Sequence, residues 1–308
     1  MKILCATDLL PKTDPAIERA HQLRAELGAR LTLMHVVIPG TTQDGTLEQR
    51  LLSANSRLAG RARRATAPVE LVVRCGRPAK VVTETARSRH ADLVVIGPHD
   101  VDPVADAIRG TMTEHIVGDA RCPVLIVRRR AREEYRSVML ALDGSTSSRH
   151  VIDTAEALGL SRRGVDRRLT AIHAHEPPYE AMMTSVGVGD ASVAKYAAAT
   201  LAQSAEAMRA ELRARSNHPE RYRLLVVEGR PVPAIRRAME ETTPDLVMLG
   251  TRGLGRFRRA LLGSTANEIL RTTDCDVLLV PETAVRAARR VQSRAVGPSP
   301  DDFPPGAA

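Results

Sequence analysis

Aromatic side chains are nearly absent from this sequence. Only 2% of its 308 residues are Phe, Trp or Tyr, and tryptophan does not occur at all. Proteins that bind single-stranded nucleic acid without sequence preference stack the bases on aromatic side chains. The composition therefore argues against that class of protein, and we expect no nucleic-acid partner.

Lysine is scarce as well. All but four of the 45 basic residues are arginine, and the formal net charge is +9. Such a skew is more typical of codon composition than of a binding surface, and several of these arginines fall within 128–136 and 286–294, an expected linker and tail. We interpret the positive charge as dispersed over a solvated surface. No Gly-Lys-Ser or Gly-Lys-Thr occurs, which excludes a P-loop.

The sequence also lacks long apolar runs and paired cysteines. No apolar run approaches the length of a membrane span, and a strand-like run begins directly after Met1, which leaves no room for a signal peptide. The four cysteines, at positions 5, 75, 122 and 275, show no C-x-x-C spacing and no histidine at a metal-ligand distance. We expect a cytoplasmic protein with no membrane association and no metal ligands. Three of the cysteines, at 5, 122 and 275, should be small buried hydrophobes.

What the sequence does contain is a regular alternation of strand-like and helix-like segments. In the first part of the chain the expected strands are 3–7, 31–37, 69–74, 92–96 and 124–127, and the expected helices are 14–27, 47–64, 78–88 and one beginning at 111. Strands that alternate with helices predict right-handed crossovers and a parallel sheet covered on both faces. The continuous apolar strands suit burial on two sides.

The same order of elements then occurs a second time. Four pairs of residues are each separated by 153 positions: Gly76 and Gly229, Gly97 and Gly250, Gly110 and Gly263, and Cys122 and Cys275. The sequence therefore predicts an α/β fold of two tandem doubly wound domains, at 1–132 and 136–282, each a five-stranded parallel sheet flanked by helices. A disordered tail is expected at 283–308, where proline and aspartate replace apolar periodicity.

The second copy is longer than the first. Asp143 follows Asp8 by only 135 positions, so the second copy carries eighteen extra residues. Most of them lie between 175 and 224, where we expect a long loop followed by a helix at 191–215. The fifth strands, 124–127 and 277–280, would leave sheet edges unpaired, so we predict that they pair or pack together within the chain.

One glycine-rich loop has the order strand, loop, helix. Gly250 and Gly253 follow the apolar run 245–249, and after a nine-residue spacer Gly263-Ser264-Thr265 precedes a helix. Glycines allow close backbone approach to a ligand, and the first turn of a helix attracts anions. Ser264 or Thr265 is expected to cap the helix. Taken alone, the loop is equally well explained as a flexible turn before a capped helix.

Two carboxylates are expected beside such loops. Asp8 and Asp143 follow the first strand of each copy, and ligands of open parallel sheets bind at the carboxyl ends of strands near the switch in strand order. Asp143 and the Gly250 loop should therefore share one rim of the sheet, which favours phosphate binding. The alternative for Asp143 is a role in the Asp-Gly-Ser turn alone. His173 and His175 are expected to have packing or hydrogen-bonding roles.

These residues resemble a known family. Both halves are similar to universal stress protein domains, and the pattern Gly-x2-Gly-x9-Gly-Ser/Thr of the ATP-binding members is present at Gly250, Gly253, Gly263 and Ser264. The resemblance implies ATP, alone or with Mg²⁺, as the ligand of a stress-linked regulator. It also implies dimers formed along the fifth strands, which tandem halves can imitate, and a homodimer of the whole chain stays open.

The resemblance also implies contacts. Asp143 would hold the ribose or adenine side, and the backbone of Ala141 and Ala174 would frame the base. Three residues would approach the phosphates and three would seat them: Gly250, Arg252 and Gly253, then Gly263, Ser264 and Thr265.

The first copy departs from this pattern. It keeps Asp8, Gly97, Gly110 and Thr111, but Asp100 replaces the middle glycine, and the spacer carries two further aspartates where the second copy has arginines. Acidic side chains repel phosphates, so we predict an impaired first site and about one strongly bound nucleotide per chain.

Two other functions remain open at this point. One is a slow ATPase or nucleotide-transfer enzyme, although the loop has no lysine and no evident general base, so we name no catalytic residue. The other is a partner-docking protein with two vestigial sites.

Overall fold

The computed structural model describes residues 1–40, 45–62, 68–97, 112–131, 133–251 and 262–282. The first half of the chain contains β1 (Lys2–Ala6), α1 (Asp14–Leu27), β2 (Arg30–Val37), α2 (Leu47–Ala62), β3 (Glu70–Cys75), α3 (Pro78–Ser88), β4 (Leu93–Ile96), α5 (Met112–Asp119) and β5 (Val124–Ile126). The second half contains β6 (Ser137–Ala141), α6 (Thr146–Ala157), β7 (Arg168–His175), α7 (Glu180–Ser185), α8 (Asp190–Arg215), β8 (Tyr222–Glu228), α9 (Pro231–Thr242), β9 (Leu246–Gly250), α10 (Ser264–Thr272) and β10 (Asp276–Val280).

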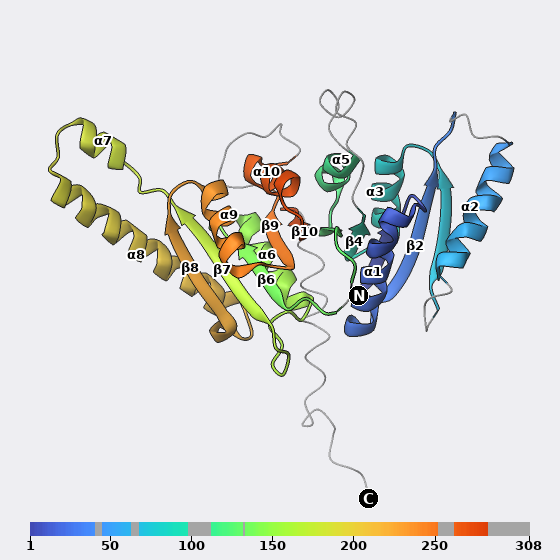
Figure 1. The fold of residues 1–308 in the computed structure, drawn as a ribbon, viewed down its shortest axis with the longest axis horizontal. Coiled ribbons are helices and arrows are strands. Elements are labelled where there is room, and N and C mark those ends of the chain that lie inside the picture. The colour runs from blue at the N-terminus through green and yellow to red at the C-terminus, as the bar shows by residue number, and fades with distance from the viewer. Residues whose placement is uncertain (41–44, 63–67, 98–111, 132, 252–261, 283–308) are drawn as a thin grey trace, which may run out of the picture.

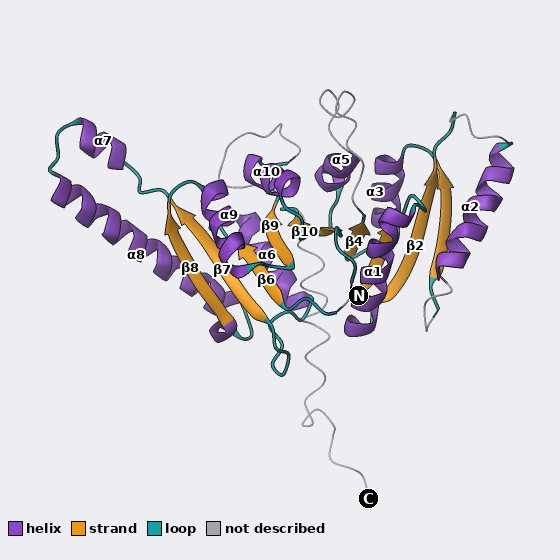
Figure 2. Ribbon diagram, viewed as in Figure 1, coloured by secondary structure: helices purple, strands orange, loops and turns teal. Residues whose placement is uncertain are grey.

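All ten strands form one sheet in the order β3-β2-β1-β4-β5-β10-β9-β6-β7-β8. Within each half the five strands are parallel, with helices on both faces, so the predicted fold class is confirmed (Figure 2). At the centre, β5 pairs antiparallel with β10 through Ile126 and Val277, Leu125 and Leu278, and Val124 and Leu279. The predicted pairing of the two fifth strands is therefore confirmed.

Side chains alternate between two cores, one on each face of the sheet. In β10, Leu278 and Val280 belong to one core and Val277 and Leu279 to the other, as the period of two of a strand requires. The first core is covered by α1, α2, α6 and α8, and the second by α3, α5, α9 and α10. Both cores contain residues from both halves, so the apolar interior is continuous across the β5–β10 pair.

The insertion in the second half contains the predicted long helix, now α8, and one further short helix. Residues 180–185 form α7, which was not predicted, and α8 is 26 residues long. In Figure 1, α7 and the start of α8 extend beyond the sheet at one end of the molecule, while α2 lies at the other end. The short α7 follows Pro177 and Pro178 and begins after Tyr179, whose φ of 69° is unusual for a residue other than glycine.

The structure also bears on two expectations from the sequence, the burial of three cysteines and the absence of a membrane span. Cys5, Cys122 and Cys275 are buried, as expected, and burial raises the pKa of the Cys5 and Cys122 thiols to about 12. Among the helices that the structure describes, none has both the length and the apolar character to cross a membrane. The tail at 283–308 lies outside the described residues.

Candidate functional site

The strand order reverses between β6 and β9 in the second half. From β6 the chain continues into α6, which packs on one face of the sheet, and from β9 it continues towards α10, on the other face. Adjacent parallel strands whose connections leave to opposite faces open a crevice at their carboxyl ends, where ligands of such sheets bind. The site predicted from the sequence lies at this switch point.

Strand register brings two of the predicted residues, Asp143 and Ala174, to one level beside Thr251. Ala141 of β6 pairs with Leu249 of β9 and with Ile172 of β7. Two positions further along β6, β9 and β7 lie Asp143, Thr251 and Ala174, respectively. Neighbouring strands of a sheet are roughly 4.8 Å apart. Together with Gly263, these residues define what we call the second-half rim.

Asp143 is held by a tight turn. Its Oδ1 accepts a hydrogen bond from the Ser145 N–H at 2.9 Å, and its own N–H donates to Ser148 Oγ at 3.0 Å. Ser145 is the N-cap of α6 and accepts from the Ser148 N–H at 3.2 Å. Gly144 has a φ of 76°, in the left-handed region that favours glycine. The carboxylate, half-buried, is thus fixed at the rim, and its turn role is real whether or not it also contacts a ligand.

The two ends of the glycine-rich loop are joined by backbone hydrogen bonds. The Thr251 N–H donates to Val280 O at 3.0 Å, and the Gly263 N–H donates to Thr251 O at 2.8 Å. Thr251 is 4% exposed, so the base of the loop is firmly packed against β10. Arg252 and Gly253, predicted to approach the phosphates, lie outside the described residues.

The first turn of α10 differs from the prediction in one respect. Gly263, with extended φ and ψ of −63° and 150°, is the N-cap, and the helix starts at Ser264. Neither Ser264 nor Thr265 is the cap, so that expectation is wrong, and Gly263 has no side chain with which to cap this end. The first-turn N–H groups of a helix lack partners within the helix and carry its positive dipole end, which suits an anion.

Of the two histidines predicted to have packing or hydrogen-bonding roles, His173 makes a hydrogen bond to the backbone, as does His35 in the first half. His173 Nδ1 lies 2.8 Å from Leu142 O, and in the first half His35 Nδ1 lies 2.8 Å from Thr7 O. Since a carbonyl only accepts, each ring nitrogen donates. Burial lowers the pKa of His35 and, with the nearby His173, that of His175.

The first-half rim, formed by Asp8, Thr13 and Gly97, is packed differently. Asp8 Oδ1 accepts from the Leu10 N–H at 2.9 Å and from the Thr13 hydroxyl at 2.8 Å. A Cβ on Gly97 would lie 2.8 Å from Thr13 Cγ2 and 3.1 Å from its Cα, so Thr13 already occupies the space beside β4. Gly110 and Thr111 lie outside the described residues.

Three residues at the rims were not singled out from the sequence: Ser148, Thr251 and Thr13. The Ser145-x-x-Ser148 spacing is typical of a helix cap and could have indicated the first. Thr251 and Thr13 had no such signal, because their roles depend on contacts between distant segments. No group of three or more His, Cys, Asp or Glu that could hold a metal ion occurs within the described ranges.

Comparisons with known proteins agree with this arrangement. The model of the universal stress protein family matches residues 1–128 and 134–281. A universal stress protein of Thermus aquaticus is 32% identical over 146 residues, which is 47% of this chain and 98% of the relative. Another, of Mycolicibacterium smegmatis, is 26% identical over 305 residues, covering 90% of this chain and 96% of the relative.

A solved structure matches both halves at once. The crystal structure of a universal stress protein from Archaeoglobus fulgidus superposes with a TM-score of 0.65 and 17% identity, over 91% of this chain and 96% of the other. At that identity the likeness shows the fold alone.

Proposed function

Because the chain belongs to the universal stress protein family, we propose that its second-half rim binds an adenine nucleotide and that the protein acts as a regulator or sensor in a stress response. ATP, alone or with Mg²⁺, is the proposed ligand. The proposal includes a cytoplasmic location, which the four free cysteines favour.

One observation carries the proposal. The Asp143 turn and the joined ends of the glycine-rich loop, Thr251 and Gly263, lie at the carboxyl ends of neighbouring strands on either side of the switch point. A carboxylate can accept hydrogen bonds from ribose hydroxyls, and the uncapped start of α10 can donate to phosphate oxygens. The family resemblance implies that the backbone of Ala141 and Ala174, small residues on β6 and β7, would frame the base.

The rim supports binding better than catalysis. Among the described residues, the polar side chains of the rim and of the adjoining first turn of α10 are Asp143, Thr251, Ser264 and Thr265. The neighbouring His173 is buried and donates to Leu142 O. Phosphoryl transfer depends on cations that neutralise developing charge and on a positioned base. We therefore propose a nucleotide-binding role, with any hydrolysis slow.

Calorimetric titration of nucleotide-free protein with ATP tests the proposal. We expect one nucleotide per chain. Asp143→Ala should weaken binding, whereas the matched first-half change Asp8→Ala should leave it nearly unchanged, because Asp8 lies beside a rim filled by Thr13. Absence of ATP binding to the intact chain, or equal losses in the two variants, would contradict it. Turnover of labelled ATP far above the uncatalysed rate and abolished by Asp143→Ala would instead support the enzyme alternative.

A further inference from the structure

A buried carboxylate lies where the two halves and their connecting segment meet. Asp276, the first residue of β10, is 1% exposed. Its Oδ1 accepts hydrogen bonds from the backbone N–H groups of Arg128 at 2.8 Å and Arg129 at 3.1 Å, and its Oδ2 accepts one from the Tyr135 hydroxyl at 2.6 Å. Arg19 Nε, on α1 of the first half, lies 3.6 Å from Oδ2. We call Arg19, Tyr135, Asp276 and these two N–H groups the Asp276 junction.

Arg19 supplies the opposite charge. Only 5% of Arg19 is exposed, its guanidinium lies 3.9 Å from the centroid of the Tyr135 ring, and one of its amino groups donates to Glu133 O at 2.9 Å. A buried charge is costly unless it is paired and hydrogen-bonded, so Arg19 and Asp276 depend on each other. Burial, with Asp276 beside it, raises the pKa of Tyr135, so the hydroxyl remains a donor.

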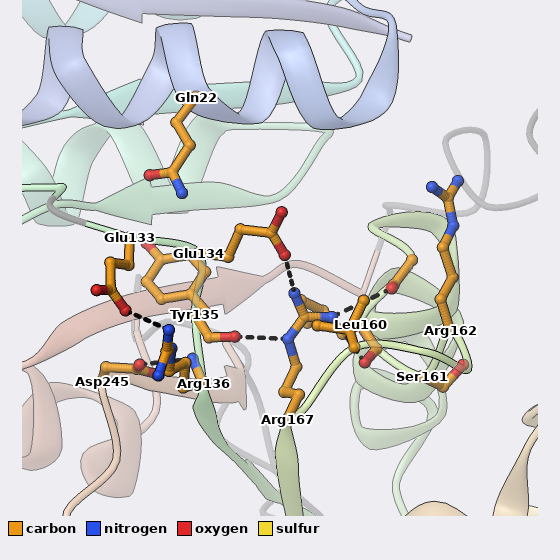
Figure 3. A network of polar contacts seen from close by, with 12 residues as sticks. Gln22, Glu133, Glu134, Tyr135, Arg136, Leu160, Ser161, Arg162, Arg167 and Asp245 are labelled. Carbon is orange, nitrogen blue, oxygen red and sulfur yellow. Dashed lines mark hydrogen bonds and ion pairs between the residues drawn. The ribbon is translucent and has the colours of Figure 1, made fainter.

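The connecting segment is also bound on its second-half side (Figure 3). Arg167 Nε donates to Tyr135 O at 2.5 Å, and another nitrogen of Arg167 donates to Leu160 O at 2.9 Å. The Arg136 N–H donates to Asp245 Oδ2 at 2.7 Å. The connector is therefore a fixed part of the structure from Glu133 to Arg136, with one side on α1 and the other on the second half.

The repeat shows that Asp276 is an addition and not a requirement of the fold. The matching position in the first half is Pro123. By contrast, Asp92 and Asp245 occupy matching positions, and each accepts a hydrogen bond from a backbone N–H near the start of the first strand of its half. Asp92 Oδ2 accepts from the Lys2 N–H at 2.8 Å, and Asp245 Oδ2 accepts from the Arg136 N–H. A carboxylate at position 276 thus serves the contact between halves, which is present once per chain.

One strand joins this junction to the proposed nucleotide site. Strand β10 is five residues long; Asp276 begins it, and Val280 O at its other end accepts the Thr251 N–H at the base of the glycine-rich loop. Between these ends, β10 pairs with β5 of the first half. Any change that tightens the loop at Thr251 therefore acts on the strand that the first half and the connector also hold.

We propose that the Asp276 junction couples the two halves through β10, so that they unfold as one cooperative unit and nucleotide bound at the second-half rim also stabilises the first half. The second part of this statement rests on the proposed function. The first part concerns the protein without ligand.

Calorimetric unfolding and hydrogen exchange of the full chain without nucleotide test the first part. We expect one thermal transition for the unchanged protein. In Asp276→Asn, which leaves Arg19 uncompensated, we expect two transitions and exchange in β5 and α1 that is faster by about tenfold or more. The matched control is Asp92→Asn, which alters a carboxylate bonded within the first half; it should keep a single transition.

A second variant guards against failure to fold. Tyr135→Phe removes only the hydroxyl donor to Asp276, and it should change exchange in β5 and α1 in the same direction by a smaller factor. If both variants keep one transition, and exchange in β5 and α1 changes no more than in Asp92→Asn, the coupling role of the junction is wrong.

Repeating the exchange with ATP as the probe tests the second part. In the unchanged protein, ATP should slow exchange in α10 and also in β5; in Tyr135→Phe the protection should remain in α10 and fall in β5. Protection of α10 alone in the unchanged protein would refute the coupling while leaving nucleotide binding intact. Protection of neither would refute the proposed function, and the experiment without ATP would still decide the role of the junction.

Discussion

The loops that follow β1 and β6 begin with the same carboxylate turn, but the residues that follow each aspartate differ. Asp8 and Asp143 each accept a backbone N–H two residues ahead. Five residues after each aspartate stand Thr13 and Ser148. The Thr13 methyl is the atom that would meet a Cβ on Gly97 at 2.8 Å, whereas Ser148 lacks that methyl and bonds the Asp143 N–H. The two halves therefore keep the same carboxylate turn but pack it differently, because Thr13 fills the space beside Gly97 in the first half.

The largest expected difference between the halves lies in their glycine loops. Gly263→Val places a branched side chain at the N-cap of α10, where the proposed site brings the phosphates close to the backbone, and should weaken ATP binding by about 100-fold or more. Gly253→Asp should act similarly by adding negative charge. Gly110→Val, the matched change in the first half, should alter the dissociation constant little. Titration calorimetry measures all three, with circular dichroism to confirm folding; a large loss from Gly110→Val would show that the first half is the binding half.

Substitution of Asp143 and of Asp8 should differ in its effect on ATP affinity, by a smaller factor than the glycine substitutions. Asp143→Asn keeps the turn but removes the negative charge that, in the proposed complex, would accept hydrogen bonds from ribose hydroxyls. ATP affinity should therefore fall about tenfold, the equivalent of one charged hydrogen bond. Asp8→Asn should leave affinity within about twofold. If the two substitutions cost the same affinity, then the rims are functionally equal despite their different packing.

The first strands of the two halves, β1 and β6, should differ in their effect on the unfolding free energy at alkaline pH. Cys5 of β1 has a folded pKa of about 12, above its value of 9.0 when exposed, and the matching residue of β6 is Leu140. A raised thiol pKa contributes stability that is complete below pH 9 and is lost as pH rises towards 12. That loss amounts to about 1.4 kcal/mol at pH 10. Cys5→Ala should therefore flatten the decline of the unfolding free energy between pH 8 and 10 (in urea titrations), and Leu140→Ala should lower the curve without changing its slope.

The smallest expected difference between the halves concerns the residue that precedes the first helical segment of each half. Ser145 caps α6 through its side chain, and Ser145→Ala should cost about 1 kcal/mol of unfolding free energy. The matching residue of the first half, Leu10, is exposed and makes no side-chain cap, so Leu10→Ala should stay within about 0.5 kcal/mol. Equal costs in thermal unfolding would mean that the Ser145 hydrogen bond contributes nothing net.

The sequence predicted what depends on local pattern and on the repeat. Alternating elements and the repeat spacing of Gly97 and Gly250 predicted the fold class and placed Asp143 and Gly250 at the carboxyl ends of strands, which the structure shows to be neighbours. The helix α7 was missed because its start depends on an unusual φ at Tyr179. The cap of α10 was misassigned because Gly263 itself takes the extended conformation, so the hydroxyls that follow it are not needed.

Contacts between segments that lie far apart in the sequence could not be predicted from local patterns. Arg19, Tyr135 and Asp276 lie far apart in the chain, and no spacing or periodicity relates them. Likewise, the contact between Thr13 and Gly97 depends on how the segment between β1 and α1 packs against the end of β4. The domain limits and the roles of the individual rim residues remain predictions.

The antiparallel pairing of β5 with β10 has a consequence for how the two copies can change over time. Because both strands belong to one chain, their association does not depend on protein concentration and survives any dilution. In an assembly of two identical chains, every substitution appears on both sides of the contact, so a site cannot be lost from one copy alone. In the fused chain, an aspartate such as Asp100 can replace a glycine in one loop while the other copy keeps its own. In a fused chain, one copy can therefore lose its binding loop while the pairing between the two copies is kept.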